Sequence, residues 1–133
     1  MVRLSLTMLR RGFAVGSQHL LTVAGRKTGQ PRSTPVSIAV VEDERYIVAA
    51  FADANWVKNV RAARTGTLSR GRAVEPVSLT ELDIAEREAA LRGFLAQVRG
   101  GRRFFGSQTA DEVVAHAALY PVFRVGKAEP PAR

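Results

Sequence analysis

One short basic segment holds the side chains best suited to bind an anion. It reads Gly25-Arg26-Lys27-Thr28-Gly29-Gln30-Pro31-Arg32. Both glycines allow positive φ, so the backbone can turn tightly and aim successive N–H groups at one point. Arginine adds a bidentate fork, lysine a point charge and threonine a hydroxyl donor. The segment predicts a phosphate cradle, although a solvated basic turn would use the same residues. Its spacing is not that of a P-loop, which argues against a nucleoside triphosphatase.

A second candidate site lies between Phe51 and Arg61, where an apolar strand opens directly into a helix. Helix N-termini attract negative charge through unpaired N–H groups, and the indole of Trp56 offers a flat apolar wall for a planar ring. Asn59 follows on the same helix. Because a lone tryptophan is as often simply part of a core, this segment indicates a ligand only in combination with the basic turn.

The periodicity of apolar side chains predicts the elements that position these residues. Strands are expected over 20–23, 33–41, 46–51, 67–70, 73–82 and 121–125, and helices over 56–63, 84–98 and 110–118. Asn55 is expected to cap the first helix, and two capping boxes, Asp83 with Glu86 and Thr109 with Glu112, to open the others. In the second strand, Val36, Ile38 and Val40 share a core face. The other face is small enough for something to lie against it.

This order contains no repeated β-α-β unit, which argues against a doubly wound sheet. It favours an α+β fold in which a mostly antiparallel sheet closes into a small barrel with peripheral helices. The length of 133 residues is that of one domain. We expect this domain to cover residues 1–126, beginning with an amphipathic segment, and residues 127–133 to form a flexible tail.

Composition narrows the functional classes. The chain has no cysteine and only two histidines, His19 and His116, so we expect neither a disulfide nor a metal site. No apolar run is long enough to cross a membrane, and a cytoplasmic location is expected. Residues 3–11 predict an amphipathic helix over the domain's own core, with weak peripheral contact to anionic lipid as the alternative.

The net charge of +8 implies an anionic partner. Residues 55–72 contain no acid, and their basic side chains are Lys58, Arg61, Arg64, Arg70 and Arg72. A single-stranded nucleic acid would require aromatic platforms between such residues, and in this stretch only Trp56 could serve. The charge therefore favours a small anionic ligand over nucleic acid.

The segment 21–32, together with Pro35, resembles the opening motif of the deazaflavin-dependent nitroreductase family. The likeness covers residues 13–126 and includes Tyr46-Ile47-Val48-Ala49-Ala50, Trp56, Asn59, Ala62 and Tyr120-Pro121-Val122-Phe123. Members have a split β-barrel of the flavin-nucleotide-binding type. Many use a reduced deazaflavin, coenzyme F(420), to reduce activated alkenes, quinones or nitroaromatics.

The resemblance implies a set of coenzyme-binding residues. Arg26, Lys27 and Arg32 would hold the phosphate, with Thr28 assisting. The side chains expected to line the deazaflavin ring are Thr34, Pro35, Ser37, Ala49 and Ala50, and those expected to close the site are Trp56 and Asn59. Members of the family that are similar to its prototype nitroreductase carry a Ser-Lys-Gly-Gly loop after the central strand. In this chain residues 51–55 stand there, and the loop is shorter.

Two further groups extend this hypothesis. Arg61 and Arg64 are candidates for contacts with the acidic tail of the coenzyme. Phe104, Phe105 and Tyr120 are candidates for the apolar wall of a substrate pocket, packing of a helix on the barrel being an equal expectation for the phenylalanines. No catalytic side chain is assigned, because the cofactor would carry the hydride to an electrophilic small molecule.

The alternatives share the fold. One is a non-catalytic protein that binds the coenzyme or a fatty acid, and another is a reductase that uses FMN. A nucleic-acid-binding small barrel ranks well below both, and the sequence leaves open whether the barrel forms a homodimer.

Overall fold

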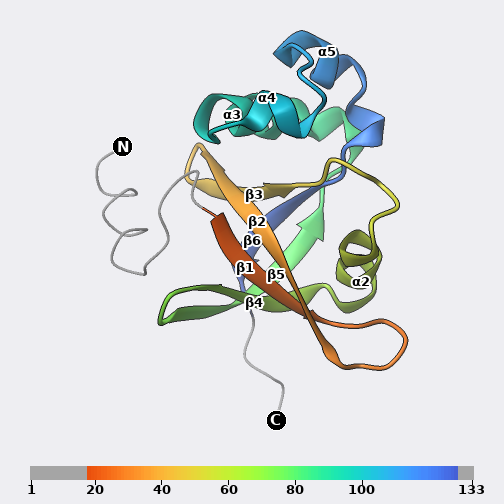
Figure 1. The fold of residues 1–133 in the computed structure, drawn as a ribbon, viewed down its shortest axis with the longest axis vertical. Coiled ribbons are helices and arrows are strands. Elements are labelled where there is room, and N and C mark those ends of the chain that lie inside the picture. Colours follow the sequence, from red (N-terminus) through yellow and green to blue (C-terminus); the bar gives the residue numbers. More distant parts are fainter. Residues whose placement is uncertain (1–17, 129–133) are drawn as a thin grey trace.

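The computed structural model describes residues 18–128, which fold into a closed barrel with helices packed outside it (Figure 1). The strands are β1 (Gln18–Ala24), β2 (Pro31–Val41), β3 (Glu44–Val48), β4 (Thr65–Arg70), β5 (Ala73–Glu81) and β6 (Val122–Lys127). Around the barrel their order is β1-β2-β3-β6-β5-β4, and every neighbouring pair is antiparallel. The predicted α+β fold with an antiparallel barrel is therefore confirmed.

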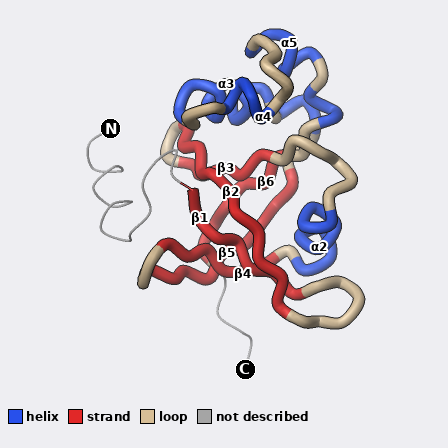
Figure 2. Tube along the Cα trace, viewed as in Figure 1, coloured by secondary structure: helices blue, strands red, loops and turns tan. Residues whose placement is uncertain are grey.

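The helices occupy two places, as Figure 2 shows. The helices of the described part are α2 (Asn55–Ala63), α3 (Glu88–Gln97), α4 (Gly101–Phe104) and α5 (Ala110–Ala115), with short 3-10 turns at Ile84–Glu86 and Ala117–Leu119. α3 packs on β2 and β3 and is joined there by α4 and α5, which lie above the barrel in Figure 1. α2 stands apart from this layer, beside the hairpin of β1 and β2.

Two hydrophobic cores result from this arrangement. The first fills the barrel and includes Leu21, Ile38 and Ile47 from the strands and Val57 and Val60 from α2. The second lies under the layer of α3 to α5 and buries strand residues of the opposite parity, which alternation points away from the barrel interior. These residues include Ala39, Val48 and Val122. Strands β2, β3 and β6 are therefore apolar on both faces.

Strand β2 shows why its second face needs small residues. Val36 and Ile38 are buried in the barrel, as predicted, whereas Ala39 is buried under α3. The side-chain amide of Gln97 on α3 bonds the backbone of Val40 in both directions, accepting from its N–H at 2.8 Å and donating to its C=O at 2.6 Å. At this end of the strand, the protein's own helix covers the small face.

Several predicted boundaries need correction. β3 ends at Val48, although the Ala49 N–H still donates to the Pro121 carbonyl at 2.8 Å, and Phe51 beyond it is 70% exposed. Ala54 stands at the N-cap of α2, without a side-chain bond, so Asn55 is the first helical residue and not the cap.

The two predicted capping boxes differ in outcome. Thr109 and Glu112 form both bonds of their box at the start of α5. Asp83 makes no capping bond, and the continuous helix predicted over 84–98 is instead a 3-10 turn followed by α3 from Glu88. The break falls at Arg87, whose buried side chain bonds backbone carbonyls outside its own helix.

Three findings complete the fold. Arg45 and Glu75 form an ion pair of low exposure between β3 and β5, with N–O distances of 2.7 and 2.9 Å. β6 continues to Lys127, which pairs with Val77, and the Ala128 N–H donates to the Pro76 carbonyl at 3.4 Å, so the predicted flexible tail does not begin at residue 127. The predicted amphipathic segment and residues 129–133 lie outside the described residues. Within 18–128, no helix has the length and apolar character needed to cross a bilayer.

Candidate functional site

An open cleft of about 540 Å³ lies between the β1–β2 loop and α2. Its lining combines residues from the two segments singled out in the sequence: Leu21, Val23, Gly25, Arg26, Lys27, Thr28, Arg32, Ser33, Thr34, Asn55, Trp56 and Asn59. The volume is in the range of small-molecule and cofactor sites. The structure therefore brings the basic turn and the start of the helix into one site.

The lining of the cleft combines a positively charged rim with an apolar base. Arg26, Lys27 and Arg32 supply positive charge, and no lining residue is an Asp or a Glu. Leu21 and Val23 belong to the barrel core and give the cleft an apolar base. A cationic rim over an apolar base suits a ligand that joins a planar apolar ring to an anionic group.

The loop between β1 and β2 is closed by its own hydrogen bonds. Gly25 donates its N–H to the Gln30 carbonyl at 2.8 Å, and Gly29 donates to the Gly25 carbonyl at 2.8 Å. Gly29 has φ of 76°, a left-handed conformation that glycine adopts without strain. Within the described part of the chain, the N–H groups of Lys27 and Thr28 have no protein partner. This pair of free donors fits the predicted anion nest.

Arg26 ties the loop to α2. Its backbone N–H donates to the Asn59 Oδ1 at 3.1 Å, and its Nη1 donates to the same oxygen at 2.8 Å. The guanidinium also makes longer contacts with Asn55, from Nη2 to Oδ1 at 3.3 Å and from Nη1 to the carbonyl at 3.5 Å. Asn59 thus holds the loop, in addition to lining the cleft.

Trp56 is both a core residue and a wall of the cleft. It packs against the barrel core, with its ring centroid 5.9 Å from that of Phe123, and it lines the cleft. Thr34 also lines the cleft, because it has the same parity as the core residues Val36 and Ile38 of β2.

Other predicted coenzyme residues lie outside the cleft. Pro35 and Ser37 have the opposite parity in β2, Ala49 is completely buried in the barrel core, and Ala50 is half-buried. None of these four residues belongs to the cleft lining. A ring seated in this cleft would contact Thr34 but not these side chains.

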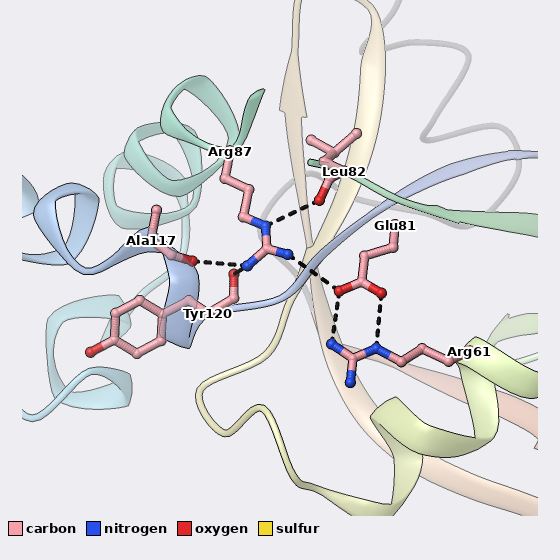
Figure 3. A network of polar contacts seen from close by, with 6 residues as sticks. All are labelled: Arg61, Glu81, Leu82, Arg87, Ala117 and Tyr120. Atoms are coloured by element: carbon pink, nitrogen blue, oxygen red, sulfur yellow. Dashed lines mark hydrogen bonds and ion pairs between the residues drawn. The ribbon is translucent and has the colours of Figure 1, made fainter. Parts of the chain in front are cut away.

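Arg61 on α2 forms an ion pair with Glu81 (Figure 3). Its Nε and Nη2 each lie 2.8 Å from a carboxylate oxygen of Glu81. The hydrogen bond from Arg61 is the main reason that the pKa of Glu81 is lowered, and the same bond raises the pKa of Arg61. With Arg64, Arg61 lines a second depression, which shares no residue with the cleft.

Glu81 also accepts a bond from Arg87, whose Nη2 lies 3.3 Å from Oε2 (Figure 3). Arg87 is buried and donates to the carbonyls of Leu82, Ala117 and Tyr120 at 3.1, 2.9 and 3.2 Å. Burial lowers the pKa of Arg87. Sequence reasoning missed both Glu81 and Arg87. Glu81 finds Arg61 at a separation of 20 residues, and Arg87 finds the carbonyls of Ala117 and Tyr120 at separations of 30 and 33, which no local pattern signals.

The three residues predicted for the substrate pocket form an aromatic cluster in the helical layer. Phe105 packs edge-on against Tyr120, with ring centroids 4.7 Å apart, and against Phe104 at 5.0 Å. The Tyr120 hydroxyl lies 2.7 Å from the Gln108 Nε2, which donates to it. None of the three residues lines the cleft, and the helix-packing interpretation accounts for their positions.

The sequence of this chain matches a known protein family. Residues 3–113 match the family described as F420H(2)-dependent quinone reductase. The chain belongs to this family. The resemblance inferred from the basic hairpin motif is thereby confirmed, and with it an oxidoreductase whose cofactor is coenzyme F(420). No curated protein matches the chain by sequence.

Several solved structures share the fold of this chain. An F420-H2 dependent reductase is 25% identical, with 81% of this chain and 92% of that chain covered and a TM-score of 0.51. A protein described as a domain-swapped dimer is 22% identical over 93% of this chain and 96% of that chain, with a TM-score of 0.57. A conserved hypothetical protein from Mycobacterium tuberculosis shares the fold at 17% identity and a TM-score of 0.54, covering 84% and 73% of the two chains.

Proposed function

We propose that this chain binds reduced coenzyme F(420) with its phosphate in the cleft and reduces an electrophilic small molecule such as a quinone, an enone or a nitroaromatic. The observation that carries the proposal is the acid-free cationic rim of Arg26, Lys27 and Arg32 above an apolar base. Membership of a quinone reductase family supports a quinone as the first substrate to test.

The residues present fit the anionic part of this cofactor. Lys27 and Arg32 would bind the phosphate oxygens, together with the Thr28 hydroxyl and the free N–H groups of Lys27 and Thr28. Trp56 would provide an apolar wall beside them. When bound, the reduced deazaflavin supplies the hydride, so the protein has to orient the cofactor and exclude water.

The side chains that line the cleft also limit which substrates can be reduced. Its lining contains no Asp, Glu, His or Tyr that could act as a general acid. We therefore propose that the balancing proton comes from solvent and that substrates are electrophilic before they bind.

A pair of titrations tests the cofactor. Purified protein is titrated separately with coenzyme F(420) and with FMN, and binding is followed by the change in cofactor fluorescence. The proposal expects binding of F(420) to be the tighter of the two. Tighter binding of FMN would overturn the cofactor assignment for this cleft.

A reaction with a simple quinone tests the activity. Reduced F(420) is mixed with the protein and menadione, and oxidation of the coenzyme is followed by its visible absorbance. The proposal expects oxidation that depends on both protein and quinone. Tight binding without oxidation of the coenzyme by a quinone, an enone or a nitroarene would favour the alternative of a coenzyme carrier.

Two proposals concern the context of the enzyme. We propose a homodimer, supported by the fold shared with a protein described as a domain-swapped dimer. Light scattering on the eluted peak of a size-exclusion column gives the mass in solution, and a monomer mass at micromolar concentration would contradict the homodimer.

A cytoplasmic location remains a prediction from composition, which cell fractionation would test.

A further inference from the structure

Asn59 is placed as a rigid anchor under the cleft. It lies on the buried side of α2 and is only 5% exposed, and its neighbours Val57 and Val60 are packed in the barrel core. Its Oδ1 accepts both the backbone N–H of Arg26, at 3.1 Å, and the Arg26 Nη1, at 2.8 Å. One oxygen therefore fixes the main chain and the side chain of a loop residue that lies far away in the sequence.

The partners of Arg26 are all neutral. Besides Asn59, the guanidinium contacts only the side-chain and backbone oxygens of Asn55 among the described residues. A carboxylate at either position would hold Arg26 equally well but would cancel its charge at the rim of the cleft. An asparagine orients the cation and leaves the positive potential in place for an anionic ligand.

The anchor also determines which donors remain for the ligand. Because the Arg26 N–H is bonded to Asn59, the next two N–H groups along the loop, those of Lys27 and Thr28, are the ones left without a partner in the described part of the chain. The bond to Asn59 fixes the point at which the turn begins, and so the direction in which these two groups can point.

We propose that Asn59 is a positioning residue of the coenzyme site: it clamps Arg26 and the β1–β2 loop onto α2, so that Lys27, Thr28 and Arg32 receive the phosphate. The inference rests on the proposed function, since the phosphate is that of coenzyme F(420). It assigns Arg26 to the clamp and to the local potential, and the direct phosphate contacts to its neighbours.

Two substitutions at Asn59 and one control substitution test the clamp. Asn59→Ala removes the accepting oxygen, whereas Asn59→Asp keeps an acceptor and adds a negative charge. Gln97→Ala is the matched control, because it removes an amide that bonds the backbone of Val40 in the helical layer, outside the cleft lining. Each protein is titrated with coenzyme F(420) and with a deazaflavin riboside that lacks the phosphate.

Asn59→Ala should weaken binding of F(420) by about tenfold or more, the worth of one hydrogen bond to a charged group, and leave binding of the phosphate-free ligand nearly unchanged. Asn59→Asp should lose affinity for F(420) through the cancelled charge while it keeps its melting temperature. Gln97→Ala should melt earlier but bind both ligands normally. Normal binding of F(420) by Asn59→Ala, or equal losses for both ligands, would overturn the inference.

Amide hydrogen exchange separates the clamp from the proposed function. In the ligand-free protein, the Arg26 N–H should exchange faster in Asn59→Ala than in the wild type or in Asn59→Asp. If the wild-type protein bound neither ligand, the proposed function would fail, and the exchange rates would still measure the clamp. An Arg26 N–H that exchanges equally fast in wild type and Asn59→Ala would overturn the clamp itself.

Discussion

Arg61 and Glu81 form a two-bond ion pair that joins α2 to the end of β5, with both N–O distances at 2.8 Å. The same carboxylate accepts a bond from the buried guanidinium of Arg87 at the start of α3. Glu81 therefore connects the helix that borders the cleft with the helical layer. The guanidinium of Arg61 is already bonded to this carboxylate through two nitrogens, which makes it a poor candidate for binding an anionic coenzyme tail.

Glu81→Gln should lower the free energy of unfolding by about 1–3 kcal/mol, because the buried Arg87 loses its carboxylate partner and keeps only carbonyl acceptors. Urea denaturation at neutral pH measures this loss. Glu88→Gln is a suitable control, since Glu88 pairs with Arg92 on an exposed helix face, where an ion pair contributes little to stability. Equal losses in the two variants would contradict the role assigned to Glu81.

The same pair should make stability depend on pH. The pKa of Glu81 in the folded protein is lowered from its ordinary value of 4.5, chiefly by the bond from Arg61. A lowered folded-state pKa stabilises the protein fully above the unfolded value and loses that effect as the pH falls through the folded value. The melting temperatures of wild type and Glu81→Gln should therefore differ by a constant amount above about pH 5 and converge in more acidic buffer. A difference that does not change with pH would contradict this prediction.

Arg64, and not Arg61, should carry any contact with the acidic tail of the coenzyme. Its exposed side chain has no protein partner among residues 18–128, and it ends α2 in a left-handed conformation with φ of 63°. Arg64→Glu should weaken binding of full coenzyme F(420) more than binding of a deazaflavin without the acidic tail. Arg61→Glu should reduce stability instead, through its contact with Glu81. Equal losses of both ligands in Arg64→Glu would mean that this part of the surface is only solvated.

Lys27→Ala and Arg32→Ala should each weaken coenzyme binding by about 1.5–3 kcal/mol, the usual value of a hydrogen bond to a charged group. Neither side chain has a protein partner in the part of the chain that the structure describes, so the melting temperature should hardly change. Arg26→Ala should lower both the affinity for the coenzyme and the melting temperature, because it also removes the side-chain bond to Asn59. Affinity of the wild type should fall as salt is raised. A dissociation constant insensitive to salt would contradict the cationic cradle.

The β1–β2 hairpin and its loop could be predicted because the signals are local. Alternating apolar residues identify the strands, and Gly25 and Gly29 mark the turn between them. The Thr109 box is equally local and formed as predicted. Part of the cleft lining also follows from strand alternation, since Leu21, Val23 and Thr34 have core-facing parity on the two strands that flank the loop.

The remaining differences come from tertiary contacts. Parity in β2 separates Pro35 and Ser37 from Thr34, so three nearby positions do not face the same ligand. The ion pair of Arg61 with Glu81 and the bond of Arg26 to Asn59 join residues 20 and 33 positions apart, and no local rule selects such partners. The Asp83 box did not form, and the helix begins instead after Arg87, whose side chain is fixed by carbonyls of another segment.

The aromatic cluster of the helical layer allows a test that separates a substrate wall from packing. Phe105 is 4% exposed, so Phe105→Ala should destabilise the fold by about 3–5 kcal/mol whatever its role. Phe104 is 43% exposed and should cost far less stability when replaced by alanine. If this cluster contacts the substrate, Phe104→Ala should raise the KM for a quinone with little change in melting temperature. An unchanged KM would assign the cluster to packing alone.

Tyr120→Phe tests the source of the proton. The Tyr120 hydroxyl accepts a hydrogen bond from Gln108 at 2.7 Å and lies outside the cleft lining, so its loss should cost about 1 kcal/mol of stability. Oxidation of reduced coenzyme by a quinone should continue in this variant, because the proton is expected from solvent. The measurement is the rate of change in visible absorbance at saturating coenzyme, with coenzyme affinity and melting temperature as controls. Loss of all turnover, with both controls intact, would show that a side-chain acid is required and that the proposed mechanism is wrong.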